Sequence, residues 1–172
     1  MLSFGSVQIR AVEPGDIGFL ADMLREAVAW RTGEAEAVRN RLGEPQLARY
    51  FDGWGRRGDR GVVAIDESGR RAGAAWYRLF ALDDRGYGFV DEHTPEITLA
   101  VEPSARRRGI GEALMHALIA AARQEGQRAL SLSVEEDNVT ALRIYTKLGF
   151  RRVGRDDDAL TMLYRVEEVG TR

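Results

Sequence analysis

Apolar and polar residues in the first half of the chain follow two periods. Stretches of period two predict strands, whereas apolar residues at every third or fourth position predict helices. The expected elements are a strand at residues 7–10, a helix at 17–28, a second helix at about 45–54, and a hairpin of strands at 62–65 and 72–80. Pro14, Gly15 and Asp16 mark the start of the first helix. The charged stretch from residue 32 to 43 shows neither period.

In the second half, strands and helices are interleaved after a polar loop at residues 81–94. The expected elements are a strand at 97–101, a helix at about 109–126, a strand at 129–134, a helix at 141–148, and a last hairpin of strands at 150–153 and 160–164. Residues from Val166 onward are expected to form a frayed tail. Hairpins beside interleaved strands and helices predict a mixed sheet covered by helices, an α/β (α+β) architecture.

Composition narrows the class of protein. The chain has 172 residues, 44% apolar and 30% charged, which fits a single domain over residues 1–172 with a sizeable core. The net charge of −2 gives no global field that would attract nucleic acid or an anionic membrane. The absence of cysteine excludes disulfides, thiolate zinc sites and a cysteine nucleophile, and no metal is expected. Because no membrane-spanning run or signal-peptide pattern is found, the expected location is the cytoplasm.

The stretch that carries chemistry lies between the strand at 97–101 and the following helix. Its residues are Arg106, Arg107, Arg108, Gly109, Ile110 and Gly111. The two glycines let the backbone approach a ligand, and amides at a helix start, with the helix dipole, form a cradle for an anion. The arginines add donors suited to phosphate oxygens. These features predict a pyrophosphate site, although a solvated basic turn before a helix would show the same residues.

Two common phosphate-binding loops do not match this stretch. A Walker loop would end in Gly-Lys-Ser/Thr, where this chain has Gly111-Glu112-Ala113. A dinucleotide-binding fingerprint would need a glycine at the position of Leu114. The stretch is therefore neither a Walker loop nor a dinucleotide-binding fingerprint.

Two stretches together resemble the GNAT superfamily, the Gcn5-related N-acetyltransferases. Arg106-x-x-Gly109-x-Gly111 is similar to the family's acyl-CoA signature, Gln/Arg-x-x-Gly-x-Gly/Ala. The family's pattern after its fifth strand is matched by Asn138, Ala141, Tyr145, Gly149 and Phe150. Both signatures occur at the expected separation and in the expected strand-helix setting.

The resemblance implies a GNAT-like mixed, mostly antiparallel central sheet of about six or seven strands, flanked by about four helices. The sheet would splay between its fourth and fifth strands, and acetyl-CoA would bind there as cosubstrate. The residues implied to contact it are Leu99, Ala100 and Val101 for the pantetheine arm and Arg106, Arg107, Arg108, Gly109, Ile110 and Gly111 for the pyrophosphate. Asn138 would contact the pantetheine, cap the next helix, or do both.

The resemblance also implies which side chains act in acetyl transfer. An amine with a pKa near ~10 must lose a proton before it attacks, and Glu96 is the expected base, with Glu92 and His93 as runners-up. Tyr145 is the expected donor to the departing thiolate. A buried tyrosine in an apolar stripe is the alternative interpretation. The chain has neither a cysteine nor a serine elbow, so direct attack in a ternary complex is expected.

These observations predict an acyl-CoA-dependent N-acetyltransferase whose acceptor is a primary amine of a small molecule or a protein. A non-catalytic acyl-CoA-binding or regulatory domain is the main alternative, and another acyl-CoA donor stays open. Acids and aromatics in the loop at 81–94 suit a cationic amine, although an ordinary acidic surface loop has the same composition. No nucleic-acid or membrane partner is expected, and the sequence leaves open whether the protein forms a homodimer.

Overall fold

The computed structural model describes residues 2–4, 7–32 and 43–166. Hydrogen bonding links eight strands in the order β1-β2-β3-β4-β5-β6-β8-β7. Their bounds are β1 Leu2–Phe4, β2 Val7–Ala11, β3 Arg60–Ile65, β4 Arg71–Arg78, β5 Glu96–Val101, β6 Ala129–Glu135, β7 Arg151–Asp156 and β8 Ala159–Arg165. The helices are α1 Ile17–Thr32, α3 Pro45–Ala48, α4 Ile110–Gln124 and α5 Val139–Leu148, with short 3-10 turns η1 Pro14–Asp16 and η2 Pro103–Ala105.

The sheet is mixed, as expected. The β1–β2, β2–β3, β6–β8 and β7–β8 pairs are antiparallel, whereas β5 and β6 are parallel. The β5–β6 register consists of one residue pair, Glu96 with Ser131, beside a bond from Ser131 N to the Pro95 carbonyl. The parallel pairing of β5 with β6 is therefore short.

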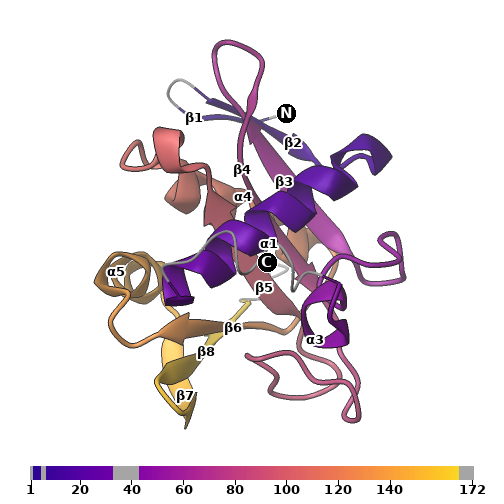
Figure 1. Ribbon diagram of the computed structural model, residues 1–172. Helices are drawn as coiled ribbons and strands as arrows, with labels where there is room; N and C mark the ends of the chain where they lie inside the picture. Colours follow the sequence, from indigo (N-terminus) through magenta and orange to yellow (C-terminus); the bar gives the residue numbers. More distant parts are fainter. Residues whose placement is uncertain (1, 5–6, 33–42, 167–172) are drawn as a thin grey trace, which may run out of the picture. The chain divides into compact units, whose positions relative to one another are not determined.

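The contacts divide the chain into two compact units. The first unit contains Met1–Trp76 and Thr98–Leu118, and the second contains Tyr77–Ile97 and Ile119–Arg172. In the first unit, β2, β3 and β4 run side by side (Figure 1). Its core is built from α1, the strands and the first half of α4, with the fully buried side chains Leu20, Met23, Val63, Trp76 and Leu114.

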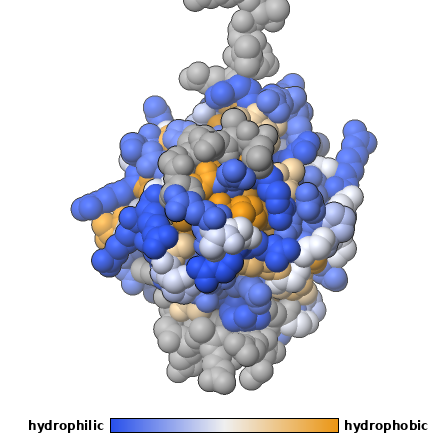
Figure 2. All heavy atoms as spheres, turned by 90° about the horizontal axis from the view of Figure 1, so that it is seen from above, coloured by the Kyte–Doolittle hydropathy of each residue, from blue (hydrophilic) through white to orange (hydrophobic). Residues whose placement is uncertain are grey.

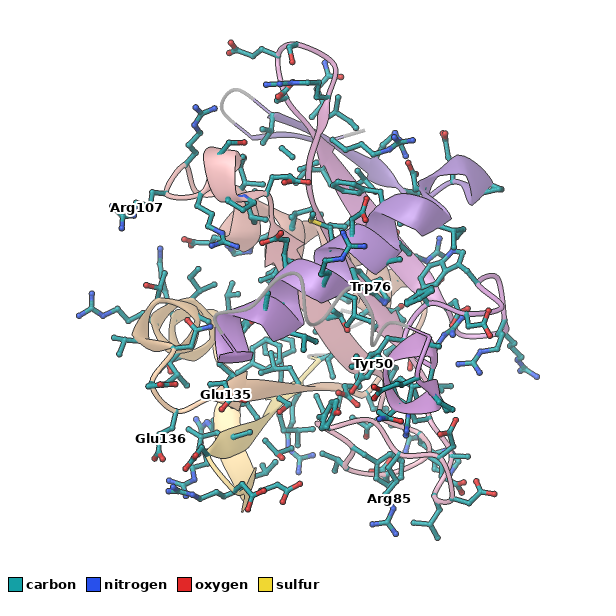
Figure 3. All side chains as sticks on the ribbon, in the orientation of Figure 1. Tyr50, Trp76, Arg85, Arg107, Glu135 and Glu136 are labelled. Atoms are coloured by element: carbon teal, nitrogen blue, oxygen red, sulfur yellow. The ribbon has the colours of Figure 1, made fainter. Side chains whose placement is uncertain are left out.

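Trp76 also connects the turn after α3 to the sheet of the first unit. Its indole Nε1 donates to the Tyr50 carbonyl over 2.8 Å, and both residues are buried (Figure 3). Burying an indole N–H without a hydrogen-bond partner costs free energy, and this bond supplies the partner. Trp76 is therefore a core residue.

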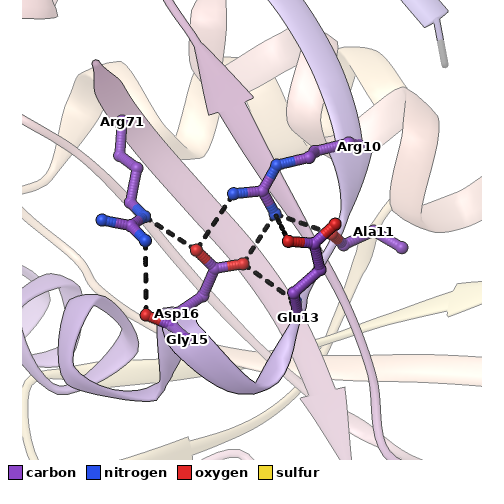
Figure 4. Close-up of polar contacts among 6 residues, drawn as sticks. All are labelled: Arg10, Ala11, Glu13, Gly15, Asp16 and Arg71. Atoms are coloured by element: carbon purple, nitrogen blue, oxygen red, sulfur yellow. Dashed lines mark hydrogen bonds and ion pairs between the residues drawn. The ribbon is translucent and has the colours of Figure 1, made fainter. Parts of the chain in front are cut away.

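A second anchor in the first unit is a buried carboxylate. Asp16 is 1% exposed and accepts from Arg10 Nη1 and Nη2 at 2.6 and 3.0 Å, from Arg71 Nε at 2.7 Å and from the Glu13 amide at 2.8 Å (Figure 4). The hydrogen bonds from Arg10 are the largest cause that holds the pKa of Asp16 well below its usual range, and they outweigh burial, which raises it. The network ties η1 to β2 and β4.

In the second unit, α5 and the β6–β8–β7 strands enclose an apolar core. Leu130, Leu132, Phe150 and Met162 are buried. Gly149 ends α5 in the left-handed conformation (φ 101°), and its amide donates to the Thr146 carbonyl.

Figure 2 shows the face of the molecule that lies at the top of Figure 1. Most of the coloured residues on this face are hydrophilic.

Most expected elements are confirmed, with three differences. The sheet includes a short strand that the pattern does not predict, because Leu2–Phe4 pairs with β2. The helix expected at about 45–54 ends at Ala48, residues 49–53 form hydrogen-bonded turns, and the positive φ of Gly53 keeps a helix from reaching Trp54. Val166 is buried and its amide donates to the Arg128 carbonyl, so the expected tail does not begin there. Residues 167–172 and most of the unassigned stretch at 32–43 lie outside the described residues.

Candidate acyl-CoA site

The predicted pyrophosphate turn has an unusual backbone. Arg107 and Gly109 have φ angles of 63° and 74°, both in the left-handed region. A non-glycine residue with positive φ is uncommon and is enriched at functional sites. Gly109 precedes α4, and the Ala113 amide donates to the Gly109 carbonyl over 3.0 Å. The turn is therefore a tight, preformed entry to a helix.

The amides of this turn suit an anion. Within the described part of the chain, the backbone amides of Arg107, Gly109, Ile110 and Gly111 have no hydrogen-bond acceptor. A Cβ added to Gly109 would meet no atom within 4 Å, so this position faces open space. The side chains of Arg106, Arg107 and Arg108 are exposed, and Arg107 points away from the ribbon (Figure 3). Unbonded amides, a helix N-terminus and three arginines together can bind a pyrophosphate.

Arg106 makes two contacts that the sequence did not predict. Its Nε donates to the Val101 carbonyl at the end of β5, and its Nη2 lies 3.2 Å from Glu26 Oε2 in α1. Glu26 is 80 residues away along the chain, and its position on the helix gives no motif that would have identified it. The guanidinium thus connects the turn to both α1 and β5.

The strand expected to contact the pantetheine arm is β5. Ala100 is buried, whereas Leu99 and Val101 are partly exposed. Gly73 of β4 lies against this strand, since a Cβ there would come within 2.9 Å of the Ala100 carbonyl oxygen and 3.2 Å of Val101 Cα. The Glu102 amide donates to the Ala72 carbonyl just beyond it. Gly73, which sequence reasoning did not single out, therefore permits the close approach of β4 to β5.

Asn138 acts as a helix cap. Its side-chain oxygen accepts from the Ala141 amide over 3.2 Å at the start of α5. This is the usual N-cap geometry, in which a polar side chain satisfies an amide that has no partner within the helix. The capping role is confirmed, and the ligand contact stays a prediction.

Tyr145 lies on the buried face of α5. It is 7% exposed, and its ring centroid lies 5.8 Å from that of Phe150, which in turn lies 5.2 Å from Tyr164. Burial raises the pKa of the Tyr145 phenol above its ordinary value. The hydroxyl is therefore protonated throughout the neutral range, the state that a hydrogen-bond donor requires.

Glu96 is buried at the start of β5, with 3% exposure. Its Oε1 accepts from the Gly88 amide over 2.8 Å. A Cβ added to Gly88 would lie 2.5 Å from the Leu132 carbonyl carbon, so only glycine fits at this contact with β6.

The alternative bases Glu92 and His93 are exposed, and Glu92 Oε1 accepts from the Leu82 amide. Sequence reasoning named Glu96 but not Gly88.

The predicted residues fall in both compact units. Arg106 to Gly111 belong to the first unit, whereas Asn138, Tyr145 and Glu96 belong to the second. The described residues contain no group of three or more histidine, cysteine, aspartate or glutamate side chains that could hold a metal ion. Within the same described ranges, no helix has the length and apolar character needed to cross a membrane.

Comparison with known proteins gives one family. The model of the acetyltransferase (GNAT) family matches residues 24–150. The mycothiol acetyltransferase of Actinosynnema mirum is 28% identical over 148 residues, which cover 85% of this chain and 45% of that protein. The mycothiol acetyltransferase of Amycolatopsis mediterranei is 34% identical over 152 residues, covering 76% of this chain and 48% of that protein. The chain thus spans about half the length of these curated relatives.

The fold has close counterparts among solved structures. The PaiA N-acetyltransferase of Thermoplasma acidophilum, solved in complex with coenzyme A, aligns with a TM-score of 0.68 at 18% identity. That alignment covers 93% of this chain and 99% of the other. The family match spans more than half of the sequence and includes both motifs singled out above. The chain belongs to the GNAT acetyltransferase family.

Proposed function

We propose that this chain is one acetyltransferase domain that transfers an acetyl group from acetyl-CoA to a primary amine by direct attack in a ternary complex. The observation that carries the proposal is the turn before α4, where two left-handed residues leave a run of amides available for an anion. In the proposal, residues 106–111 hold the pyrophosphate, Leu99, Ala100 and Val101 contact the pantetheine arm, and Asn138 adds a contact beside its capping role.

The proton transfers are assigned to two side chains. Glu96 accepts the proton of the attacking amine, directly or through water, as the N–C bond forms. Tyr145 donates a hydrogen bond or proton to the thiolate as the C–S bond breaks, and it regains a proton from solvent. A β5 amide near Leu99 donates to the carbonyl oxygen as it gains negative charge. The absence of cysteine in the sequence favours this direct route over a thioester on the enzyme.

The direct test measures CoA release with acetyl-CoA and a panel of acceptors. The panel contains small amines, peptide amines and the amine acceptor of mycothiol acetyltransferases, because the curated relatives carry that name. Release of CoA that depends on one of these amines supports the proposal. Acetyl-CoA binding without turnover on any acceptor would favour the non-catalytic alternative.

Tyr145→Phe is expected to lower turnover roughly ten-fold or more, about 1.4 kcal/mol in activation free energy, with little change in acetyl-CoA affinity or melting temperature. Phenylalanine keeps the ring and its contact with Phe150 but removes the donor. Tyr164→Phe is the matched control, because Tyr164 stacks on the same Phe150 ring. Steady-state kinetics with acetyl-CoA in excess measure the effect. If both variants keep wild-type turnover while chemistry limits the rate, Tyr145 is only a core residue.

Glu96→Gln is expected to lower turnover and leave acetyl-CoA affinity unchanged. The glutamine oxygen can still accept from the Gly88 amide, so the loop keeps its anchor while the base is lost. The wild-type rate should rise with pH through a limb that the variant lacks or that shifts. Glu92→Gln, which changes an exposed carboxylate in the loop before β5, is the control. Full activity of Glu96→Gln at neutral pH would assign proton removal to another group.

A further inference from the structure

An ion pair connects the predicted pyrophosphate turn, residues 106–111, to α1. Arg106 Nη2 lies 3.2 Å from Glu26 Oε2, and the two side chains are 44% and 25% exposed. Arg106 Nε is held separately by the Val101 carbonyl. The arginine would therefore keep one anchor to β5 even without Glu26. Glu26 supplies mainly a negative charge beside a turn that is proposed to hold a polyanion.

Other carboxylates add negative charge near the Arg106–Glu26 pair. Glu102 follows β5, and its pKa is raised by burial first and then by repulsion from Glu26 and Asp22, while Arg106 opposes the shift. Asp22 has its own partner, Arg25 Nη1 at 3.0 Å. Glu26 and Glu102 thus both lie within electrostatic reach of the Arg106 guanidinium, and Asp22 adds a further negative charge near Glu102. Charges this close are only partly screened at physiological salt.

We propose that Glu26 is a counter-charge to Arg106 that weakens the binding of acyl-CoA phosphates and speeds the release of product CoA. The inference rests on the proposed function, because it assigns Glu26 a role at the same turn. A phosphate bound at residues 107–111 competes with the Glu26 carboxylate for the Arg106 guanidinium and is also repelled by it. Affinity changes within one interface fall mainly on the dissociation rate, so Glu26 sets how long CoA stays bound.

The test is Glu26→Gln, which removes the charge but keeps an oxygen that can accept from Arg106. Calorimetry should show CoA bound roughly three-fold more tightly, the scale of a partly exposed ion pair. Stopped-flow dissociation should slow by a similar factor, and product inhibition by CoA should strengthen. The gain should disappear in the Arg106→Gln background. Asp22→Asn, which removes a carboxylate paired with Arg25 instead, should give a smaller change.

Failure of the Glu26 proposal can be told apart from failure of the proposed function. Unchanged or weaker CoA binding in Glu26→Gln, or a gain that persists without Arg106, overturns the inference. If wild-type protein does not bind CoA at all, the proposed function fails, and inorganic pyrophosphate becomes the probe. Tighter pyrophosphate binding by Glu26→Gln would then uphold the counter-charge role of Glu26, whereas no change would reject it too.

Discussion

Asp16→Asn is expected to lower the free energy of unfolding by about 3 kcal/mol, the scale for breaking a buried charge network. The carboxylate is almost fully buried and receives bonds from two guanidinium groups and one amide. Asparagine is similar in size but carries no charge, so Arg10 and Arg71 lose their common counter-ion and the loss is electrostatic. Urea denaturation followed by tryptophan fluorescence measures the change.

Asp22→Asn provides the control for this loss. Asp22 also pairs with an arginine, at 3.0 Å, but its side chain is 53% exposed. A surface pair of this kind contributes at most about 1 kcal/mol, and commonly less. Equal losses for the two variants would show that the buried network has no special weight.

The Asp16 network also predicts a dependence on pH. The pKa of Asp16 is depressed in the folded protein, so its stabilisation is complete above the unfolded value of about 3.9 and is lost as the pH falls toward the folded value. The difference in unfolding free energy between wild type and Asp16→Asn should therefore be constant at neutral pH and shrink below about pH 4. A difference that stays constant down to pH 2 would contradict the assigned cause.

Local signals in the sequence were sufficient for most of the fold. The start of α1 follows from Pro14 and the apolar face behind it, and the end of α5 follows from Gly149, because caps and periodicity act over a few residues. The strand β1 was missed because three residues are too few for a periodic signal. The end of α3 at Ala48 is not predicted by the apolar pattern, which continues past that residue.

The candidate site shows the same division. Its turn and the Asn138 cap are local motifs, and both occur in the expected strand-helix setting. The partners of those motifs are not local. Glu26 approaches Arg106 across 80 residues, and Arg71 approaches Asp16 across 55. Such pairs form only when the sheet and helices pack, and a single sequence carries no signal of which acid meets which base.

Gly109→Glu is expected to weaken CoA binding at least ~100-fold, about 2.7 kcal/mol, while the protein stays folded. The substitution places a carboxylate at the start of α4, where the amides proposed to receive the pyrophosphate lie. The added side chain meets no atom within 4 Å, so it fills the space the anion would use and does not disturb the core. The positive φ costs about 1–2 kcal/mol, partly offset by a negative charge at a helix N-terminus. Calorimetric titration with CoA and a thermal melt measure the two effects.

Gly126→Glu separates backbone strain from loss of the site. Gly126 follows the other end of α4, has a φ of 72° and also faces open space, so its substitution carries the same conformational cost without touching the turn. Gly109→Gln adds similar bulk without the charge and should fall between wild type and Gly109→Glu in affinity. If Gly109→Glu folds and binds CoA as tightly as Gly126→Glu does, the pyrophosphate is not held at this turn, and the proposed roles of residues 106–111 are wrong.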